Sequence, residues 1–203
     1  MRLLLPLLAL ALAPPPQEPA FSAAEPPQRL TLQIGEHALQ VTMGETFVMP
    51  DDAAGQECRL IPSPFRQLLL PGAVSYDYPD GATFLGATFV PEFMWWNVVA
   101  NGEMLVLQRH VGTGDAAHHR NLYAENCVKC GSKDLGTCSI KVDGRALSGR
   151  KIAGRSDHDF VQEIYSFEHA GATWLLVLDS TADQPRPLRD RLLASFRFLK
   201  TAD

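Results

Sequence analysis

Three cysteines and two histidines lie between residues 118 and 138, and their side chains are the ones best suited to chemistry. They follow the pattern H-H-x7-C-x2-C-x7-C. The members of this cluster are His118, His119, Cys127, Cys130 and Cys138. Thiolates and imidazoles bind zinc or copper, and paired thiols form disulfides or exchange them with other thiols. The spacing therefore allows three kinds of chemistry.

The first interpretation is structural disulfides, which an oxidising compartment favours. The candidates are Cys58, Cys127, Cys130 and Cys138. Four cysteines allow three complete pairings, and the spacing alone does not choose among them. Every pairing would involve the segment 127–138, which is rich in Gly, Lys and Ser and is expected to be a loop. Such a staple typically stabilises a fold by about 2–4 kcal/mol.

The other two interpretations are a metal site and thiol exchange. A zinc or copper site would use His118, His119, Cys127, Cys130 and Cys138, although the second C-x2-C or H-x3-5-H pair of common zinc sites is missing. Adjacent histidines also point to different sides of a helix. A redox C-x-x-C usually begins a helix, where the dipole favours the thiolate. No helical pattern begins after Cys130, so the expectation is no cofactor, with zinc or copper as the alternative.

Length, composition and charge limit the class of protein. The chain has 203 residues, of which 46% are hydrophobic and 20% charged, with a net charge of -5. These values exclude a disordered chain and a polytopic membrane protein. The negative charge argues against nucleic acid as the main partner, because nucleic-acid binding needs a basic face. The expected partner is a protein or a small ligand.

The N-terminus predicts export. Met1-Arg2 precedes the apolar run from Leu3 to Ala13, which is typical of a secretory signal peptide and too short for a transmembrane helix. We therefore expect a signal peptide over residues 1–24, a proline-rich linker over 25–29 and one domain over 30–203. The mature protein would be periplasmic or secreted, without a transmembrane segment.

Strands dominate the expected domain. Alternating apolar residues and turn signals such as Asn101-Gly102 and Asp143-Gly144 predict hairpins. The strands are expected at residues 30–34, 38–49, 74–78, 82–90, 93–100, 103–111, 140–152 (interrupted by the second turn) and 160–178 (interrupted at 169–171). Residues 51–64 are expected to be a loop. Residues 103–111 carry apolar side chains on both faces, which predicts a central strand.

Two helices complete the pattern. Residues 115–126 lack β-branched side chains and could form a helix capped by Asp115 or Thr113. Leu188, Leu192, Leu193 and Phe196 mark the apolar face of a helix after Pro187. The fold class is therefore α+β, a mostly antiparallel sheet flanked by helices. The basic residues of the last helix are expected to form its solvated face.

Two adjacent tryptophans lie in the strand at 93–100. Trp95 and Trp96 must face opposite sides of a sheet, because side chains alternate along a strand. One of them would fill the core. The other would lie under a helix or form an exposed binding surface.

The order of elements resembles the PsbP-like, or Mog-type, α/β/α sandwich family. The segments similar to that family are Tyr78-Pro79-Asp80-Gly81, Val142-Asp143-Gly144-Arg145-Ala146, Trp174 to Leu178, and Leu192-Leu193-Ala194-Ser195-Phe196. The resemblance implies a non-enzymatic binding or assembly role and supplies no catalytic residue.

The sequence thus favours an exported binding or assembly protein. The alternative is a periplasmic metal- or thiol-handling protein that uses the Cys127–Cys138 segment. A hydrolase is the third interpretation, since a catalytic triad can be assembled from residues far apart in the sequence. However, the sequence contains no nucleophile-elbow, metalloprotease or P-loop motif.

Overall fold

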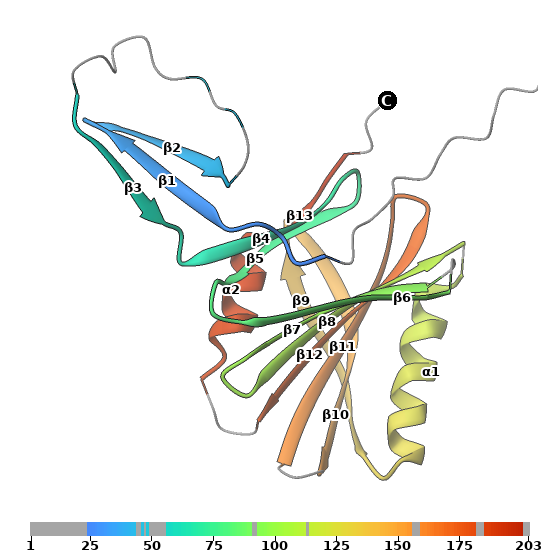
Figure 1. Ribbon diagram of the computed structural model, residues 1–203. Coiled ribbons are helices and arrows are strands. Elements are labelled where there is room, and N and C mark those ends of the chain that lie inside the picture. The colour runs from blue at the N-terminus through green and yellow to red at the C-terminus, as the bar shows by residue number, and fades with distance from the viewer. Residues whose placement is uncertain are drawn as a thin grey trace, which may run out of the picture.

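A seven-stranded antiparallel sheet forms the body of the molecule. The computed structural model describes residues 24–43, 46, 48, 56–90, 93–112, 114–155, 159–181 and 185–200. The strands of the large sheet are β6 (Thr83–Val90), β7 (Phe93–Ala100), β8 (Glu103–Val111), β9 (Lys133–Val142), β10 (Arg145–Arg155), β11 (Asp159–His169) and β12 (Ala172–Thr181). Their order is β6-β7-β8-β12-β11-β10-β9, and every neighbouring pair is antiparallel (Figure 1).

The two hairpin turns predicted from the sequence are confirmed. Asn101 and Gly102 have φ values of 51° and 76°, and Asp143 and Gly144 have values of 46° and 78°. Two successive residues with positive φ form the tight turn whose twist matches that of the flanking strands. These turns fix the register of β7 against β8 and of β9 against β10.

The strand predicted to be central does lie inside the sheet. β8 is bonded to β7 on one side and to β12 on the other. Leu105 and Leu107 are fully buried on one face, and Val106 is buried on the opposite face. A strand covered on both sides needs apolar residues on both faces, which explains the unbroken apolar run.

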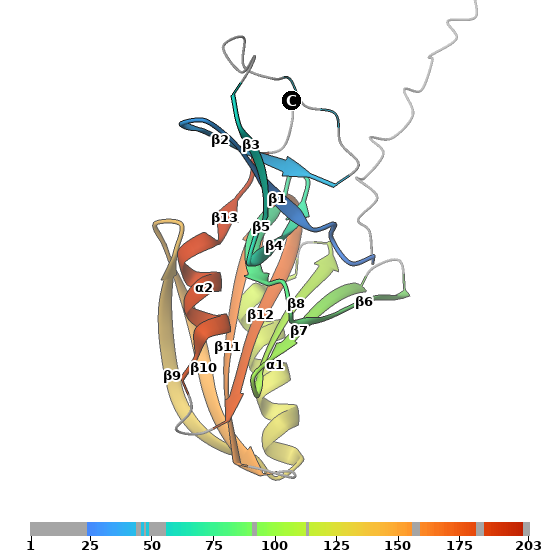
Figure 2. The same ribbon diagram turned by 60° about the vertical axis from the view of Figure 1, so that its left-hand side comes forward.

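One helix covers each face of the sheet (Figure 2). The two helices are α1 (Ala116–Lys129) and α2 (Pro187–Ser195). Ala124 of α1 packs in a small cluster with Val106 and Val177. Leu188 and Leu192 of α2 belong to the larger cluster on the other face. The α+β class and the α/β/α layering expected from the sequence are therefore confirmed.

A second, three-stranded sheet extends the larger cluster. It contains β4 (Phe65–Leu70), β5 (Val74–Pro79) and β13 (Arg197–Phe198), in the order β13-β5-β4. Tyr76 stacks on Phe196 with 6.2 Å between ring centroids, and both rings are fully buried. The chain that follows α2 thus joins this sheet to the helix.

A third sheet, which we call the arm, projects from the body at the end opposite the C-terminal end of α1 (Figures 1 and 2). It contains β1 (Arg29–Ile34), β2 (His37–Thr42) and β3 (Cys58–Pro62), and it buries Leu32, Ile34 and Val41. The hairpin predicted from strands at 30–34 and 38–49 is confirmed by β1 and β2, although β2 ends at Thr42 and part of 43–49 lies outside the described residues. The prediction of a loop over 51–64 is wrong for residues 58–62, which form β3. These residues are a strand because they pair with β1, and their exposed side chains give no alternating pattern.

The cysteine-rich segment is not a loop. α1 runs to Lys129 and so includes Cys127, while Cys138 lies within β9. The helix ends in a Schellman motif. The N–H of Gly131 donates to the carbonyl of Val128, and that of Ser132 donates to Cys127. Gly131 has a φ of 99°, which glycine adopts readily. The prediction of a loop failed because this glycine ends a helix after both cysteines.

The signal peptide predicted for residues 1–24 lies outside the described residues except for Ala24. The predicted linker at 25–29 is fixed to the body, since Arg66 pairs with Glu25 at 3.2 Å and donates to the carbonyl of Pro26 at 3.1 Å. Within the described part of the chain, neither helix has the length and apolar character needed to cross a bilayer.

Candidate functional site

The C-x-x-C pair lies at the C-terminal end of α1. Cys127 is half-buried in the last turn, and its thiol donates to Oε1 of Gln162 at 3.9 Å. Cys130 is the exposed C-cap residue. Burial raises the pKa of the Cys127 thiol, and the neighbouring Cys130 and Asp179 raise it further. The negative end of the helix dipole acts in the same direction, unlike the helix start that activates redox cysteines.

Both cysteines line a hollow between the end of α1 and strands β10 and β11. The hollow has a volume of about 450 Å³. Tyr123 and Phe160 provide aromatic surface, and Gln162 and Arg155 provide polar groups. Burial raises the pKa of Tyr123 to about 12, with smaller contributions from Cys127 and Asp179, so its phenol is neutral and can donate a hydrogen bond. No sequence pattern reveals this hollow, because its residues come from three separate elements.

Cys138 lies on the opposite face of the sheet. It packs against the cluster covered by α2, whereas Cys127 packs against the cluster covered by α1. Burial raises the pKa of the Cys138 thiol, although a hydrogen bond with Tyr165 opposes the shift. The sheet therefore separates Cys138 from the C-x-x-C pair.

The fourth cysteine is in the arm. Cys58 is exposed on β3 opposite Ile34, and all four cysteines are free thiols in this structure. Of the four disulfide candidates, the structure brings together Cys127 and Cys130 alone.

The residues of the predicted metal site are not brought together. His118 and Cys127 are nine residues apart along α1, a separation of about 13 Å. His119 instead lies beside His110 of β8, with 4.6 Å between ring centroids. Within the described ranges, no group of three His, Cys, Asp or Glu side chains could hold a metal ion.

The two tryptophans do face opposite sides of the sheet. Trp96 is fully buried and stacks on Trp174 with 6.3 Å between centroids. Trp95 is half-buried on the other face. Nearby on that face, Val99 and Leu85 are 38% and 51% exposed. The core role expected for one tryptophan therefore belongs to Trp96, and Trp95 remains a candidate surface residue.

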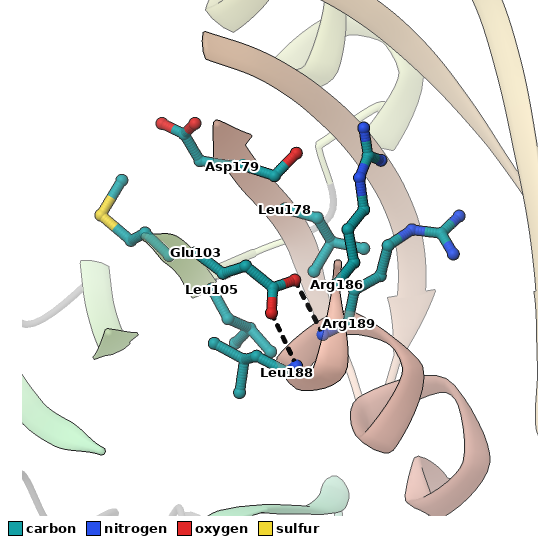
Figure 3. Close-up of a pocket in the computed structure, with 9 residues that line it drawn as sticks. Glu103, Leu105, Leu178, Asp179, Arg186, Leu188 and Arg189 are labelled. Atoms are coloured by element: carbon teal, nitrogen blue, oxygen red, sulfur yellow. Dashed lines mark hydrogen bonds between the residues drawn. The ribbon is translucent and has the colours of Figure 1, made fainter. Parts of the chain in front are cut away.

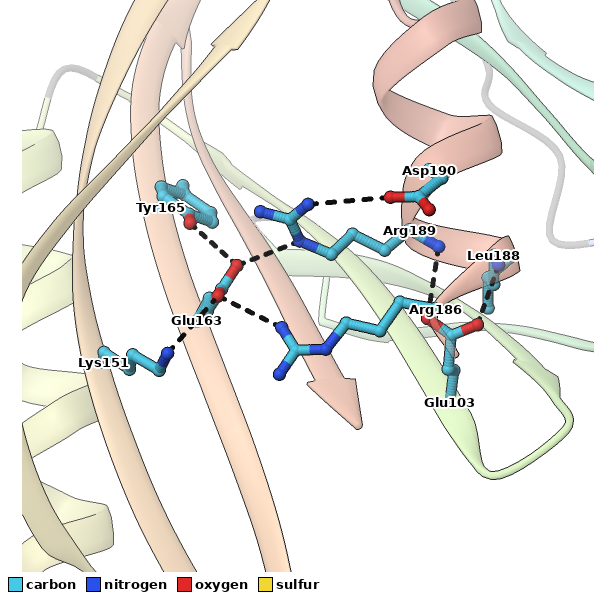
Figure 4. A network of polar contacts seen from close by, with 8 residues as sticks. All are labelled: Glu103, Lys151, Glu163, Tyr165, Arg186, Leu188, Arg189 and Asp190. Atoms are coloured by element: carbon cyan, nitrogen blue, oxygen red, sulfur yellow. Dashed lines mark hydrogen bonds and ion pairs between the residues drawn. The ribbon is translucent and has the colours of Figure 1, made fainter. Parts of the chain in front are cut away.

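A cluster of charged residues under α2 was not expected from the sequence (Figure 4). Glu163 of β11, whose side chain is 9% exposed, pairs with Arg186 at 3.2 Å and with Arg189 at 3.1 Å. It also accepts a hydrogen bond of 2.9 Å from Tyr165 and lies 3.9 Å from Nζ of Lys151. Burial raises the pKa of Glu163, but Arg189, Tyr165 and Arg186 together outweigh burial and lower it.

A second buried carboxylate caps the N-terminus of α2 (Figure 3). Glu103 of β8 accepts hydrogen bonds from the backbone N–H groups of Leu188 at 2.8 Å and Arg189 at 3.3 Å. The space beside these residues is about 10 Å³, which is roughly the room of one water molecule. This site therefore anchors a helix and has no room for a substrate.

The expectation that the basic residues of the last helix form its solvated face is wrong for three arginines, the N-cap residue Arg186 and two residues of α2. Arg186 and Arg189 bind Glu163, and Arg191 pairs with Asp77 and lies 3.9 Å above the ring of Phe65. A usable signal was present in the sequence, because Glu163 stands inside an otherwise apolar strand pattern. A buried carboxylate at such a position needs a cation or several hydrogen-bond donors around it.

Another hollow, of about 440 Å³, lies where the arm leaves the body. It is lined by residues 24–27, Arg29, Thr42 and β4, including the exposed Leu69. It gathers fewer polar side chains from the body than the hollow at the end of α1 does.

Comparison with known proteins gives matches in structure alone. No protein-family model matches the sequence, and no curated protein matches it significantly. A crystal structure from Bacteroides thetaiotaomicron is 9% identical with a TM-score of 0.46, over 68% of this chain and 50% of that one. The chain therefore spans half the length of the Bacteroides chain.

Two further structures match most of their own length. LpqN, involved in cell envelope biogenesis of Mycobacterium tuberculosis, is 14% identical with a TM-score of 0.42, over 68% of this chain and 92% of that one. The cyanobacterial PsbP (CyanoP) of Synechocystis is 12% identical with a TM-score of 0.46, over 66% and 92%. The solved structures that match this chain include a PsbP protein, a member of the family named in the sequence analysis.

Proposed function

We propose that this chain is an exported, non-enzymatic binding protein whose site is the hollow at the end of α1. The observation that carries the proposal is the hollow itself, with about 450 Å³ between α1, β10 and β11. Binding sites for small molecules commonly have this size, with aromatic walls and a few polar groups.

The lining suggests the chemistry of the occupant. Tyr123 and Phe160 suit an apolar ring or chain, and the amides of Asn126 and Gln162 suit polar groups. Arg155 is 82% exposed and pairs with Asp159 at 3.5 Å, so it can also meet an anion at the rim. The occupant is therefore a small apolar molecule with an anionic or amide group, or a partner's side chain of that kind.

The state of the polar groups favours binding over catalysis. The raised pKa of Cys127 keeps its thiol protonated at neutral pH, which makes it a poor nucleophile. The buried carboxylates Glu163 and Glu103 are engaged in holding α2. These groups contribute to the stability of the fold.

The binding proposal can be tested with anilinonaphthalene sulfonate, a fluorescent apolar anion. We expect saturable binding to the folded protein and a roughly tenfold loss of affinity in Phe160→Ala, the effect of losing about 1.4 kcal/mol. Arg155→Ser, at an exposed position, should weaken binding without affecting folding. Leu69→Ala, in the other hollow, should bind as the unchanged protein does. Loss of binding in Leu69→Ala, or equal binding in all variants, would contradict the proposal.

Export rests on the basic start and the apolar run from Leu3 to Ala13. Fusing residues 1–29 to alkaline phosphatase, which is active after export, tests this part separately. We expect activity from the fusion and none when residues 3–13 are deleted. An inactive fusion that is produced in full would contradict export.

A further inference from the structure

The fold decides which cysteines can meet. Cys127 and Cys130 belong to one turn and line the same hollow. Cys138 packs in the cluster on the other face of the sheet. Cys58 lies in β3 of the arm, and the arm is at the opposite end of the molecule from the C-terminal end of α1 (Figures 1 and 2). A bond between Cys127 and Cys138 would have to join side chains that pack on opposite faces of the sheet.

The turn that carries the pair is tight. The N–H of Cys130 donates to the carbonyls of both Asn126 and Cys127, each at 3.1 Å. Residues three apart on a helix have Cβ atoms about 5–6 Å apart, and a disulfide needs about 3.5–4.5 Å. The remaining gap is about 1–2 Å by the same measures. Cys130 can close it, because it is the exposed C-cap residue and its backbone, with φ -84° and ψ 8°, has already left the helix.

We infer that Cys127 and Cys130 form a disulfide when the chain meets an oxidising thiol–disulfide partner, and that Cys58 and Cys138 remain thiols. This bond forms whether or not the hollow binds a ligand. The inference therefore extends the proposed function without depending on it.

The reaction needs only a disulfide as oxidant. The thiolate of Cys130 attacks one sulfur of the partner disulfide and releases one partner thiolate. Cys127 then loses its proton and attacks Sγ of Cys130, which releases the second thiolate. Two thiols are oxidised, one disulfide is reduced, and the two protons pass to the released thiolates. The bond also removes the hydrogen bond from Cys127 to Gln162, so Oε1 of Gln162 becomes available to an occupant of the hollow.

The sequence provides a direct assay. Lys129 lies between the two cysteines, so trypsin separates them into peptides 121–129 and 130–133, while Cys58 and Cys138 fall in peptides 30–59 and 134–141. The intact chain is equilibrated with oxidised and reduced glutathione, alkylated, digested and analysed by mass spectrometry. We expect peptides 121–129 and 130–133 to stay linked, and to separate after reduction.

Two variants make the outcome decisive. Cys138→Ala should keep the linked peptides, and Cys130→Ser should lose them and leave Cys127 open to alkylation after unfolding. The inference is overturned if Cys127 or Cys130 is found linked to Cys58 or Cys138, or if no link forms at an oxidising glutathione ratio. Circular dichroism of each variant verifies that it is folded. The dye assay on the same samples reports separately on the proposed function.

Discussion

The carboxylate of Glu103 accepts a 2.8 Å hydrogen bond from the backbone N–H of Leu188, the second residue of α2. The residue before the helix, Arg186, makes no side-chain capping bond. The N–H groups of a first helical turn need acceptors, and a side chain of the cap residue usually supplies one. Here a strand 85 residues earlier in the chain supplies it.

Removing this distant cap should destabilise the fold. We expect Glu103→Ala to lower the free energy of unfolding by about 1–3 kcal/mol, because two backbone donors beside Leu188 lose their acceptor. Urea denaturation followed by circular dichroism measures the loss. Glu168→Ala, at an exposed position on β11, is the matched control and should change stability by less than about 0.5 kcal/mol. Equal effects of the two substitutions would show that the cap is unimportant.

The charged cluster around Glu163 should make the free energy of unfolding depend on pH. The pKa of Glu163 is lowered in the folded protein from its ordinary value of 4.5. The stabilisation is therefore complete above that value and is lost as the pH falls through the folded pKa. We expect Glu163→Gln to cost about 1.5–3 kcal/mol at neutral pH, the worth of hydrogen bonds to a charged group, and the difference from the unchanged protein to shrink at more acidic pH. The measurement is urea denaturation over a pH series.

A matched control for this cluster is Asp190→Asn. Asp190 is 74% exposed and pairs with Arg189 at 3.8 Å, so it should contribute little. A cost at neutral pH that stays constant down to strongly acidic pH would contradict the role of the Glu163 charge.

The two tryptophans should differ in their effect on stability. Trp96 is fully buried against Trp174, so Trp96→Ala should cost about 3–5 kcal/mol. Trp95 is half-buried, and Trp95→Ala should cost clearly less. Acrylamide quenching of Trp95→Phe and Trp96→Phe gives an independent measure. Acrylamide reaches the half-buried Trp95 more easily than Trp96, so quenching of the fluorescence should fall in Trp95→Phe and persist in Trp96→Phe. Equal quenching of the two variants would contradict the assigned faces.

The four reduced thiols should react in a fixed order. Cys58 and Cys130 are exposed, whereas burial raises the pKa of Cys127 and of Cys138. Because the thiolate is the reactive form, we expect iodoacetamide at about pH 8 to modify the first two roughly tenfold faster. Timed alkylation and peptide mass spectrometry measure each rate. Faster modification of Cys127 than of Cys130 would contradict the geometry at the end of α1.

Much of the fold follows from local chemistry. Asn101-Gly102 and Asp143-Gly144 predicted two hairpin turns, since these residues tolerate positive φ. The apolar spacing of Leu188, Leu192 and Phe196 predicted α2 and its buried face. Asp115 was a predicted cap of α1, and its side chain does accept from the N–H of Ala117 at 2.8 Å. Each of these signals lies within a few residues of its effect.

The features that failed depend on distant partners. β3 becomes a strand because β1 pairs with it, and its own exposed side chains give no pattern. Arg186 and Arg189 look like solvent-facing residues until β11 brings Glu163 beneath them. The same limit applies to the hollow, which joins Tyr123 on α1 to Phe160 on β11.

The sequence by itself determined the two hairpin turns, the alternating strands and the apolar face of α2, because each depends on neighbouring residues. The tertiary structure alone decided what the cysteines can do. A C-x-x-C motif alone does not specify whether it lies at the N-terminal or the C-terminal end of a helix. Only the fold shows that α1 ends at Lys129 with Cys130 as its C-cap, and that the sheet lies between this pair and Cys138. Pairing of thiols depends on distance in space, which spacing along the chain does not specify.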